Sequence, residues 1–435
     1  MKKLLMGLFA VGLVLAMALP AFALDNEFGG FWRTRAYMQK DFTGSDTGVK
    51  DISQVDTRTR LFYTAVFSED FKFVNRFEFN FTWGDTASAS PTTTNGGGIA
   101  SSTADRSVFR LKNSYANFNL GSFNFLVGLQ PRVLHRGFLF DADFAGLTAA
   151  YNGDGFSIPF IWMKAYEGQY GNDSNDNDVD FYGLKPTFTA GNVALTPTLV
   201  YVYSKDGSKY LGVAQEIGVY FAGLDADVKF GDGSSAWFTG IYAGGSIDTN
   251  AAARAAALAA TVPSVLPNSI DIGGYLLALG GTVKMGALDI HGQAFYATGD
   301  DTKTLDKYEG FFVPQGQMYY WSEIMGYGLF DNQASANAPA DKINNIEAIN
   351  IGVGLKANDK LSFKADLWYA KLVEDTAAAK SDPLGTEIDL KVTYALMKNL
   401  NLDVIGAYLF AGDGTYKGAG SSNPYEVGAM LSFSF

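Results

Sequence analysis

The sequence of 435 residues contains no cysteine. This absence excludes disulfide bridges, thiolate metal sites, covalent attachment of a c-type haem and a lipid anchor on an N-terminal cysteine. Only two histidines occur, His135 and His291. No zinc spacing, phosphate-binding loop or nucleophile elbow accompanies them. The sequence therefore predicts no metal, no cofactor and no catalytic residue.

Long apolar runs are also missing after the N-terminal segment. None approaches the ~20 residues that a membrane-spanning helix needs. Yet 47% of the residues are hydrophobic, with 34 Phe and 23 Tyr against only 12 Pro. The apolar residues are therefore dispersed, as alternating β-strands would disperse them.

Positive charge is scarce, with 33 Lys and Arg against 45 Asp and Glu and a formal net charge of −12. No basic run or nucleic-acid-binding motif offsets this balance. The composition thus argues against a nucleic-acid-binding function.

The N-terminal segment has the three parts of a secretory signal. Lys2 and Lys3 precede an apolar run over residues 4–19, followed by Pro20 and the small-x-small tripeptide of residues 21–23. We expect residues 1–23 to be a cleaved signal peptide, which leaves one mature domain over residues 24–435. A membrane anchor is the alternative, but the run is short for it.

The last nine residues alternate in hydrophobicity with a period of two, which is typical of a strand with two different faces. In a soluble protein such an apolar edge strand invites aggregation. In a membrane barrel it is the closing strand, with the terminal aromatic residue at the interfacial girdle. The apolar face comprises Val427, Ala429, Leu431, Phe433 and Phe435; the other comprises Gly428, Met430, Ser432 and Ser434.

The same alternation recurs along the chain in segments of about ten residues. Links between the segments are alternately short and long, which predicts an all-β, transmembrane, antiparallel up-and-down β-barrel of about 18 strands, with 16 as the alternative. Both termini are then periplasmic. Two turns are candidates within residues 211–244, near Gly223 or at 231–233, and only one of them keeps the strand number even. The long links are predicted at 41–53, 84–105, 131–144, 168–178, 204–210, 244–269, 299–345, 374–385 and 412–424.

Cationic side chains cluster on the first four predicted strands, on the parity opposite to the apolar residues. A cation on the lipid face would cost about 2–4 kcal/mol at the midplane, so these side chains are expected to face the lumen. Together they predict a basic strip that concentrates anions. The alternative is ordinary lumen arginines paired with acids such as Glu78. The strip comprises Arg33, Arg35, Arg58, Arg60, Arg76, Arg110 and Lys112.

Two links have unusual compositions. The link 131–144 is apolar and carries Arg132, His135, Arg136, Asp141 and Asp143. It is predicted to fold inward, with acids that face the basic strip, or else to extend the strands outside the pore. The segment 308–330 is rich in aromatics. It is either an ordinary outer loop or a loop that folds into the barrel mouth.

Several motifs resemble the porins of Gram-negative anaerobes, which are similar in turn to the barrels that export acidic polysaccharide. They are Trp32-Arg-Thr-Arg35, Asp56-Thr-Arg-Thr-Arg60, the segment from Phe71 to Asp85, and Gly128-Leu-Gln130 leading into His135-Arg-Gly-Phe138. The resemblance covers residues 28–150 and the last strand. It implies an outer-membrane channel for passive diffusion of small hydrophilic solutes with a preference for anions. Porins are commonly trimers, so a homotrimer is one candidate assembly.

Three functions remain open at this point. The first is a diffusion porin biased toward small anions. The second is a substrate-specific channel for acidic saccharides or other organic anions. The third is a structural barrel that sheathes a partner protein, for which about 18 strands give too narrow a lumen. An enzymatic barrel is disfavoured, because no serine motif accompanies either histidine.

Overall fold

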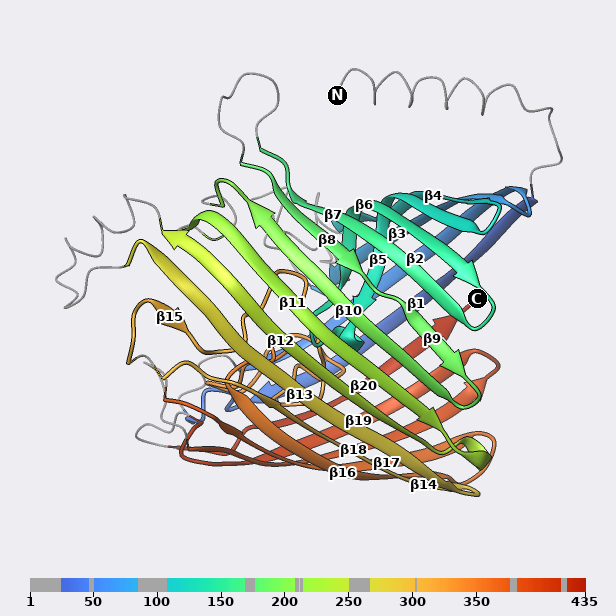
Figure 1. Ribbon diagram of the computed structural model, residues 1–435. Coiled ribbons are helices and arrows are strands. Elements are labelled where there is room, and N and C mark those ends of the chain that lie inside the picture. The colour runs from blue at the N-terminus through green and yellow to red at the C-terminus, as the bar shows by residue number, and fades with distance from the viewer. Residues whose placement is uncertain are drawn as a thin grey trace.

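The computed structural model describes residues 25–46, 51–84, 108–168, 177–207, 211, 214–249, 267–301, 303–375, 382–415 and 421–435. The predicted signal peptide lies outside these residues. Within them the chain is all-β (Figure 1). The strands are β1 Asp25–Lys40, β2 Ile52–Ser68, β3 Phe71–Thr82, β4 Val108–Leu120, β5 Phe123–Leu134, β6 Phe140–Gly153, β7 Phe156–Tyr166, β8 Val179–Leu184, β9 Thr187–Ala190, β10 Val193–Ser204, β11 Ala214–Lys229, β12 Ser235–Thr249, β13 Ser269–Met285, β14 Leu288–Ala297, β15 Lys307–Tyr308, β16 Ile346–Lys356, β17 Leu361–Leu372, β18 Pro383–Met397, β19 Leu400–Ala411 and β20 Tyr425–Ser434.

The strands form one closed antiparallel barrel with 18 strand positions in its wall. Strands β8 and β9 share a single position between β7 and β10, on either side of Lys185 and Pro186. The two-residue β15 lies outside the wall and pairs in parallel with β13. The predicted 18 strands are therefore confirmed, and the alternative of 16 is wrong.

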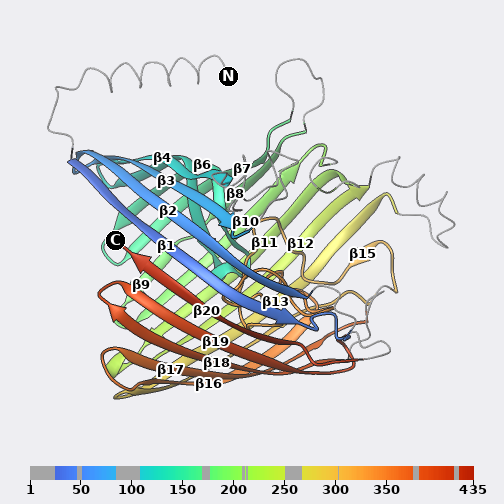
Figure 2. The ribbon, with the colours of Figure 1, turned by 180° about the vertical axis from the view of Figure 1, so that it is seen from behind.

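Strand β20 pairs with β1 and closes the barrel (Figure 2). In this register Ser432 lies opposite Arg33 and Met430 lies opposite Arg35. The closing strand therefore lies beside the first arginines. Strand β1 begins and β20 ends at the same end of the barrel, where the short turns gather.

In the described residues of the ambiguous region, 211 and 214–244, one turn connects two strands, the short 3-10 turn η2 at Gly231–Gly233. Gly223 lies in the middle of β11 instead, paired with Thr198 on one side and Ile241 on the other. The predicted link 244–269 also starts too early, because β12 continues to Thr249. Its glycines, Gly244 and Gly245, resemble a loop in composition but belong to the wall.

Aromatic side chains form part of a girdle on the outer surface. Four of them pair in register across neighbouring strands of the wall: Trp162 with Tyr182, Tyr182 with Tyr201, and Tyr201 with Tyr220. Each is exposed, at 37–40%. Exposed aromatic rings on an apolar outer wall are typical of a membrane–water interface. Among the described residues, the structure contains no helix with the length and hydrophobicity that a membrane crossing requires.

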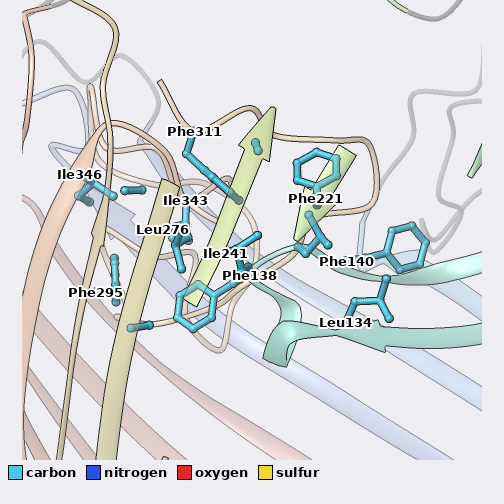
Figure 3. Packing of buried hydrophobic residues seen from close by; sticks show 14 of the residues in the cluster. Leu134, Phe138, Phe140, Phe221, Ile241, Leu276, Phe295, Phe311, Ile343 and Ile346 are labelled. Atoms are coloured by element: carbon cyan, nitrogen blue, oxygen red, sulfur yellow. The ribbon is translucent and has the colours of Figure 1, made fainter. Parts of the chain in front are cut away.

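The largest buried apolar cluster lies inside the barrel (Figure 3). Val200, Val219, Ile241 and Leu276 point inward from the strands and are at most 2% exposed. They pack against segments that enter from the links, such as Phe311. This inner core was not predicted from the sequence. Its signal is a loss of alternation, as in residues 199–203 of β10, where both faces are apolar because both are covered.

The predicted link 131–144 requires a correction. Residues 131–134 belong to β5 and residues 140–144 to β6, so only 135–139 lie between the strands. Pairing of β5 with β4 ends at Leu129, and pairing of β6 with β7 begins at Ala145. Beyond those points the two strands pair only with each other. The hairpin therefore leaves the wall at this level.

Two glycines mark the place where the hairpin bends. Gly128 and Gly146 stand opposite each other in the β5–β6 register. Gly128 has φ +127°, and a Cβ there would lie 2.4 Å from the carbonyl oxygen of Ser114. A Cβ at Gly146 would lie 1.9 Å from the carbonyl oxygen of Trp162. Side chains at either position would push the hairpin away from its neighbours.

Candidate functional site

The inner faces of β1 to β4 bring the predicted arginines together. Arg33 of β1 stands opposite Arg58 of β2, and Arg60 stands opposite Glu78 of β3, which is in turn opposite Arg110 of β4. Since neighbouring strands lie ~4.8 Å apart, these guanidinium groups share one patch of wall. We call Arg33, Arg35, Arg58, Arg60 and Arg110 the arginine strip.

Each arginine of the strip has an acidic neighbour from the wall or from a loop. Arg35 binds Asp56 through two bonds, Nε–Oδ1 at 3.0 Å and Nη2–Oδ2 at 2.8 Å. Glu78 accepts a 2.7 Å bond from Arg60 Nε and lies 3.7 Å from Arg58 and 3.8 Å from Arg110. The alternative considered from the sequence, that lumen arginines pair with acids such as Glu78, therefore holds for part of the strip.

The remaining acid comes from the long link 298–345. Asp331 Oδ1 lies 3.3 Å from Arg33 Nη2 and also contacts Arg35 Nη1, and Oδ2 lies 3.8 Å from Arg58 Nη1. One loop carboxylate therefore sits among three guanidinium groups. The sequence predicted that Asp141 and Asp143 face the basic strip, and Asp143 does pair with Lys112 of that strip. The sequence did not identify Asp331 as the partner of the arginines.

Five guanidinium groups in the strip face three carboxylates, so the patch keeps a positive excess. The side chains of Arg33 and Arg35 are 11% and 6% exposed, whereas those of Arg60 and Arg110 are 36% and 61% exposed. The excess charge therefore faces water at Arg60 and Arg110. A cavity of about 210 Å³ opens beside the strip. Its polar lining includes Arg35, Arg58, Arg110, Gln54, Asn80, Asp56 and Asp331.

The other two cations of the predicted strip make different contacts. The Arg76 guanidinium lies over the ring of Phe62, 5.0 Å from its centroid. Lys112 Nζ forms a 2.5 Å ion pair with Asp143 Oδ2 of the β5–β6 hairpin. Asn113 donates a 2.8 Å hydrogen bond to the same carboxylate. Asp143 thus joins the hairpin to β4, next to the strip.

The residues at the hairpin tip reach across to other strands. His135 Nδ1 lies 3.1 Å from Asp225 Oδ1 of β11, and Arg136 donates a 2.7 Å bond to Asp227 of the same strand. Gly223 makes room for this contact, because a Cβ there would lie 2.6 Å from the His135 ring. The tip is a 3-10 turn, η1 His135–Gly137. It therefore rests on the wall at β11.

Arg132 and Asp141 flank the tip. Arg132 Nη2 donates a 2.7 Å hydrogen bond to Thr148 Oγ1. The Asp141 backbone N–H donates a 2.7 Å bond to the carbonyl of Gly316, in the long link. The Asp141 side chain is exposed.

The link 298–345 packs against the hairpin inside the barrel. The ring of Tyr319 stacks on Phe138 with centroids 3.7 Å apart, and Gln317 Nε2 donates a 2.5 Å bond to the Phe138 carbonyl. The Met318 backbone N–H bonds to the Gly137 carbonyl at 3.3 Å. The two segments form one inserted body, which we call the lumen insert (residues 135–139 and 308–345).

Carboxylates on β18 hold the lumen insert from the opposite side. Glu387 is fully buried and accepts bonds from Ser322 Oγ at 3.1 Å, Ile324 N at 2.6 Å and Met325 N at 2.9 Å. The Glu323 backbone N–H lies 3.3 Å from Asp389 Oδ2. Burial raises the pKa of the Glu323 carboxyl above its usual range, and the charge of Glu387 raises it further.

The wall at β14 to β19 carries a mixed set of charges. His291 Nδ1 lies 2.9 Å from Asp289 Oδ1, and its Nε2 lies 2.9 Å from Asp366 Oδ1. Lys364 pairs with Asp366 at 2.7 Å, and Lys391 lies 3.3 Å from Asp403. No three His, Cys, Asp or Glu side chains in the described part of the chain gather where they could hold a metal ion.

Comparison by sequence finds neither a matching family model nor a curated relative. Comparison of folds finds solved structures that match along nearly the whole chain. OccAB1 of Acinetobacter baumannii has a TM-score of 0.60 at 12% identity, over 94% of this chain and 96% of its own. OpdK of Pseudomonas aeruginosa, solved with vanillate, has a TM-score of 0.57 at 12% identity, over 94% and 98%. OccK2 (OpdF) of the same organism, solved in complex with glucuronate, has a TM-score of 0.59 at 12% identity, over 94% and 98%. OpdK is described as an outer membrane protein. The chain therefore has the fold of these barrels.

Proposed function

We propose that this protein is a non-enzymatic channel of the Gram-negative outer membrane, with both termini periplasmic, through which small hydrophilic solutes diffuse. The 18-stranded barrel and the aromatic residues on its outer surface support the membrane location. The similar fold of OpdK, described as an outer membrane protein, agrees with it.

The channel favours anions, and the arginine strip is the observation that carries this proposal. Five guanidinium groups and three carboxylates leave a positive excess, and Arg60 and Arg110 present it to water. A positive wall in a narrow pore raises the local concentration of anions although the whole chain is acidic. The acidic net charge of −12 therefore does not set the selectivity.

The experiment is the reversal potential of single channels in a planar bilayer under a salt gradient. The wild type should favour anions, and the double substitution R60Q/R110Q should shift the reversal potential toward cations. The matched control is K356Q/K360Q, which removes two positive charges at the distant turn between β16 and β17. A cation-selective wild type, or equal shifts in both variants, would refute the role of the strip.

Organic anions are the second candidate solutes. The cavity beside the strip combines guanidinium groups with the amides of Gln54 and Asn80, which can bind a carboxylate and hydroxyl groups together. OpdK and OccK2 were solved with vanillate and glucuronate. Glucuronate should reduce the chloride current at millimolar concentration, and glucose should not. Equal effects of glucuronate and glucose would refute specific binding of organic anions and would support only an unspecific diffusion porin.

The lumen insert argues against a sheath around another protein. Phe138, Phe311 and Ile324 of the insert are fully buried inside the barrel. This packing occupies the space that a sheathed partner would need.

A further inference from the structure

We propose that Asp331 is a tethered competitor: its carboxylate occupies the anion site of the arginine strip, and a permeating anion must displace it. The inference rests on the proposed anion channel and adds the residue that limits its selectivity. Asp331 can compete with an organic anion for the arginines, because its side chain ends in the same carboxylate group.

The contacts of Asp331 are those of a bound anion. Its two oxygens reach Arg33, Arg35 and Arg58, which come from two adjacent strands. Arg35 also donates a 2.9 Å hydrogen bond to the carbonyl of Leu329, so the same guanidinium holds the loop backbone. Guanidinium forks suit this kind of carboxylate binding.

The site retains capacity for a further oxygen. The Nε of Arg33 is buried and has no hydrogen-bond partner among the described residues. A buried N–H without a partner is unfavourable. A larger anion in place of the single Asp331 carboxylate could satisfy this donor.

Asp331 is brought to the strip by an aromatic anchor next to it. Phe330 is fully buried and stacks on Tyr37 of β1, with ring centroids 4.5 Å apart. Asn332 Nδ2 donates a 2.9 Å bond to the Tyr37 hydroxyl. The wall is hollowed for this ring at Gly428, where a Cβ would lie 2.5 Å from Phe330 Cζ. Binding of the ring, and not the ion pairs alone, therefore fixes the position of the charge.

The backbone at this point is strained. Asp331 has φ +38° and Tyr327 has φ +71°, values that L-residues rarely adopt. Such strain persists only where the surroundings impose it. The tip 327–332 is thus held in place by its contacts, and weakening them should release it.

The first test replaces the charge. D331N should raise the anion-over-cation permeability ratio about threefold in low salt, since a negative charge leaves a poorly screened site. The matched control D301N removes a charge from the same link, where Asp301 pairs with Lys303 at 2.7 Å, and should leave the ratio unchanged. A ratio unchanged in D331N, with an anion-selective wild type, would overturn the inference and leave the anion channel intact.

The second test leaves the charge in place. F330A removes the ring that stacks on Tyr37 and should release the tip, which also raises the ratio and adds fluctuations to the open current. If D331N folds poorly, F330A still decides the question. An F330A channel with the ratio and the current noise of the wild type would show that the position of the tip does not limit permeation. A cation-selective wild type would instead refute the anion channel itself.

Discussion

The carboxylate of Glu387 on β18 accepts a 2.9 Å hydrogen bond from the backbone N–H of Met325, and both residues are fully buried inside the barrel. Ile324 and Ser322 donate to the same carboxylate. Three donors from one loop segment thus converge on a single wall residue, at the side of the lumen insert away from the hairpin.

We expect E387A to loosen this attachment. The buried N–H groups of Ile324 and Met325 would lose their acceptor, at about 1–3 kcal/mol for each unsatisfied group. Amide hydrogen exchange at these two positions should accelerate, while exchange in the β18 neighbours stays slow. E387Q keeps one carbonyl acceptor and should show a smaller effect. Slow exchange at both amides in E387A would mean that other contacts hold the segment.

A second prediction concerns the space at Gly223. A Cβ there would lie 2.6 Å from the His135 ring and 2.8 Å from the carbonyl oxygen of Gly240 in β12, so G223A should displace the hairpin tip from β11 and strain the β11–β12 pairing. The ion pair of Arg136 with Asp227 should weaken with it, and the melting temperature should fall. G231A is the control, because no atom lies within 4 Å of a Cβ at that position. Equal melting temperatures of the two variants would show that the tip can move aside without loss.

The architecture was largely accessible from the sequence, but the interior was not. Alternation of hydrophobicity with a period of two identified the strands of the wall, since lipid and lumen impose opposite polarity on the two faces. Asp143 was correctly expected beside the predicted basic strip, where it pairs with Lys112, but Asp331 was missed for a physical reason. The register fixes which wall residues are neighbours, so Glu78 could be found, whereas Asp331 arrives from a loop whose path depends on the packing of Phe330 into the space at Gly428.

The pH dependence of the lumen insert follows from Glu323. Its carboxyl has a pKa raised by burial, with a further contribution from Glu387, so ionisation is less favourable in the docked loop than in a free one. Below the pKa of the free carboxyl, both states are protonated and docking carries no penalty. As the pH rises from there through the raised pKa, the penalty develops and the docked loop loses stability. Proteolysis within residues 308–345 should therefore accelerate toward neutral pH.

The control for this prediction is E323Q, which is uncharged throughout the range. Its proteolysis rate should change less with pH than that of the wild type after correction for the protease's own profile. If the two profiles coincide, the charge of Glu323 does not govern docking of the loop.

The final prediction concerns salt. The charge excess at Arg60 and Arg110 is exposed to water, so mobile ions screen it. The screening length is about 10 Å at 0.1 M and about 3 Å at 1 M ionic strength. At 0.1 M the strip influences ions across much of a narrow passage, but at 1 M only those that touch the wall. The anion-over-cation permeability ratio should therefore fall as the salt concentration rises at a constant gradient. The R60Q/R110Q channel, which lacks the exposed excess, should show a flatter dependence. A wild-type ratio that is constant from 0.1 to about 1 M would indicate direct binding of the anion to buried groups such as Arg35, because buried pairs are screened much less.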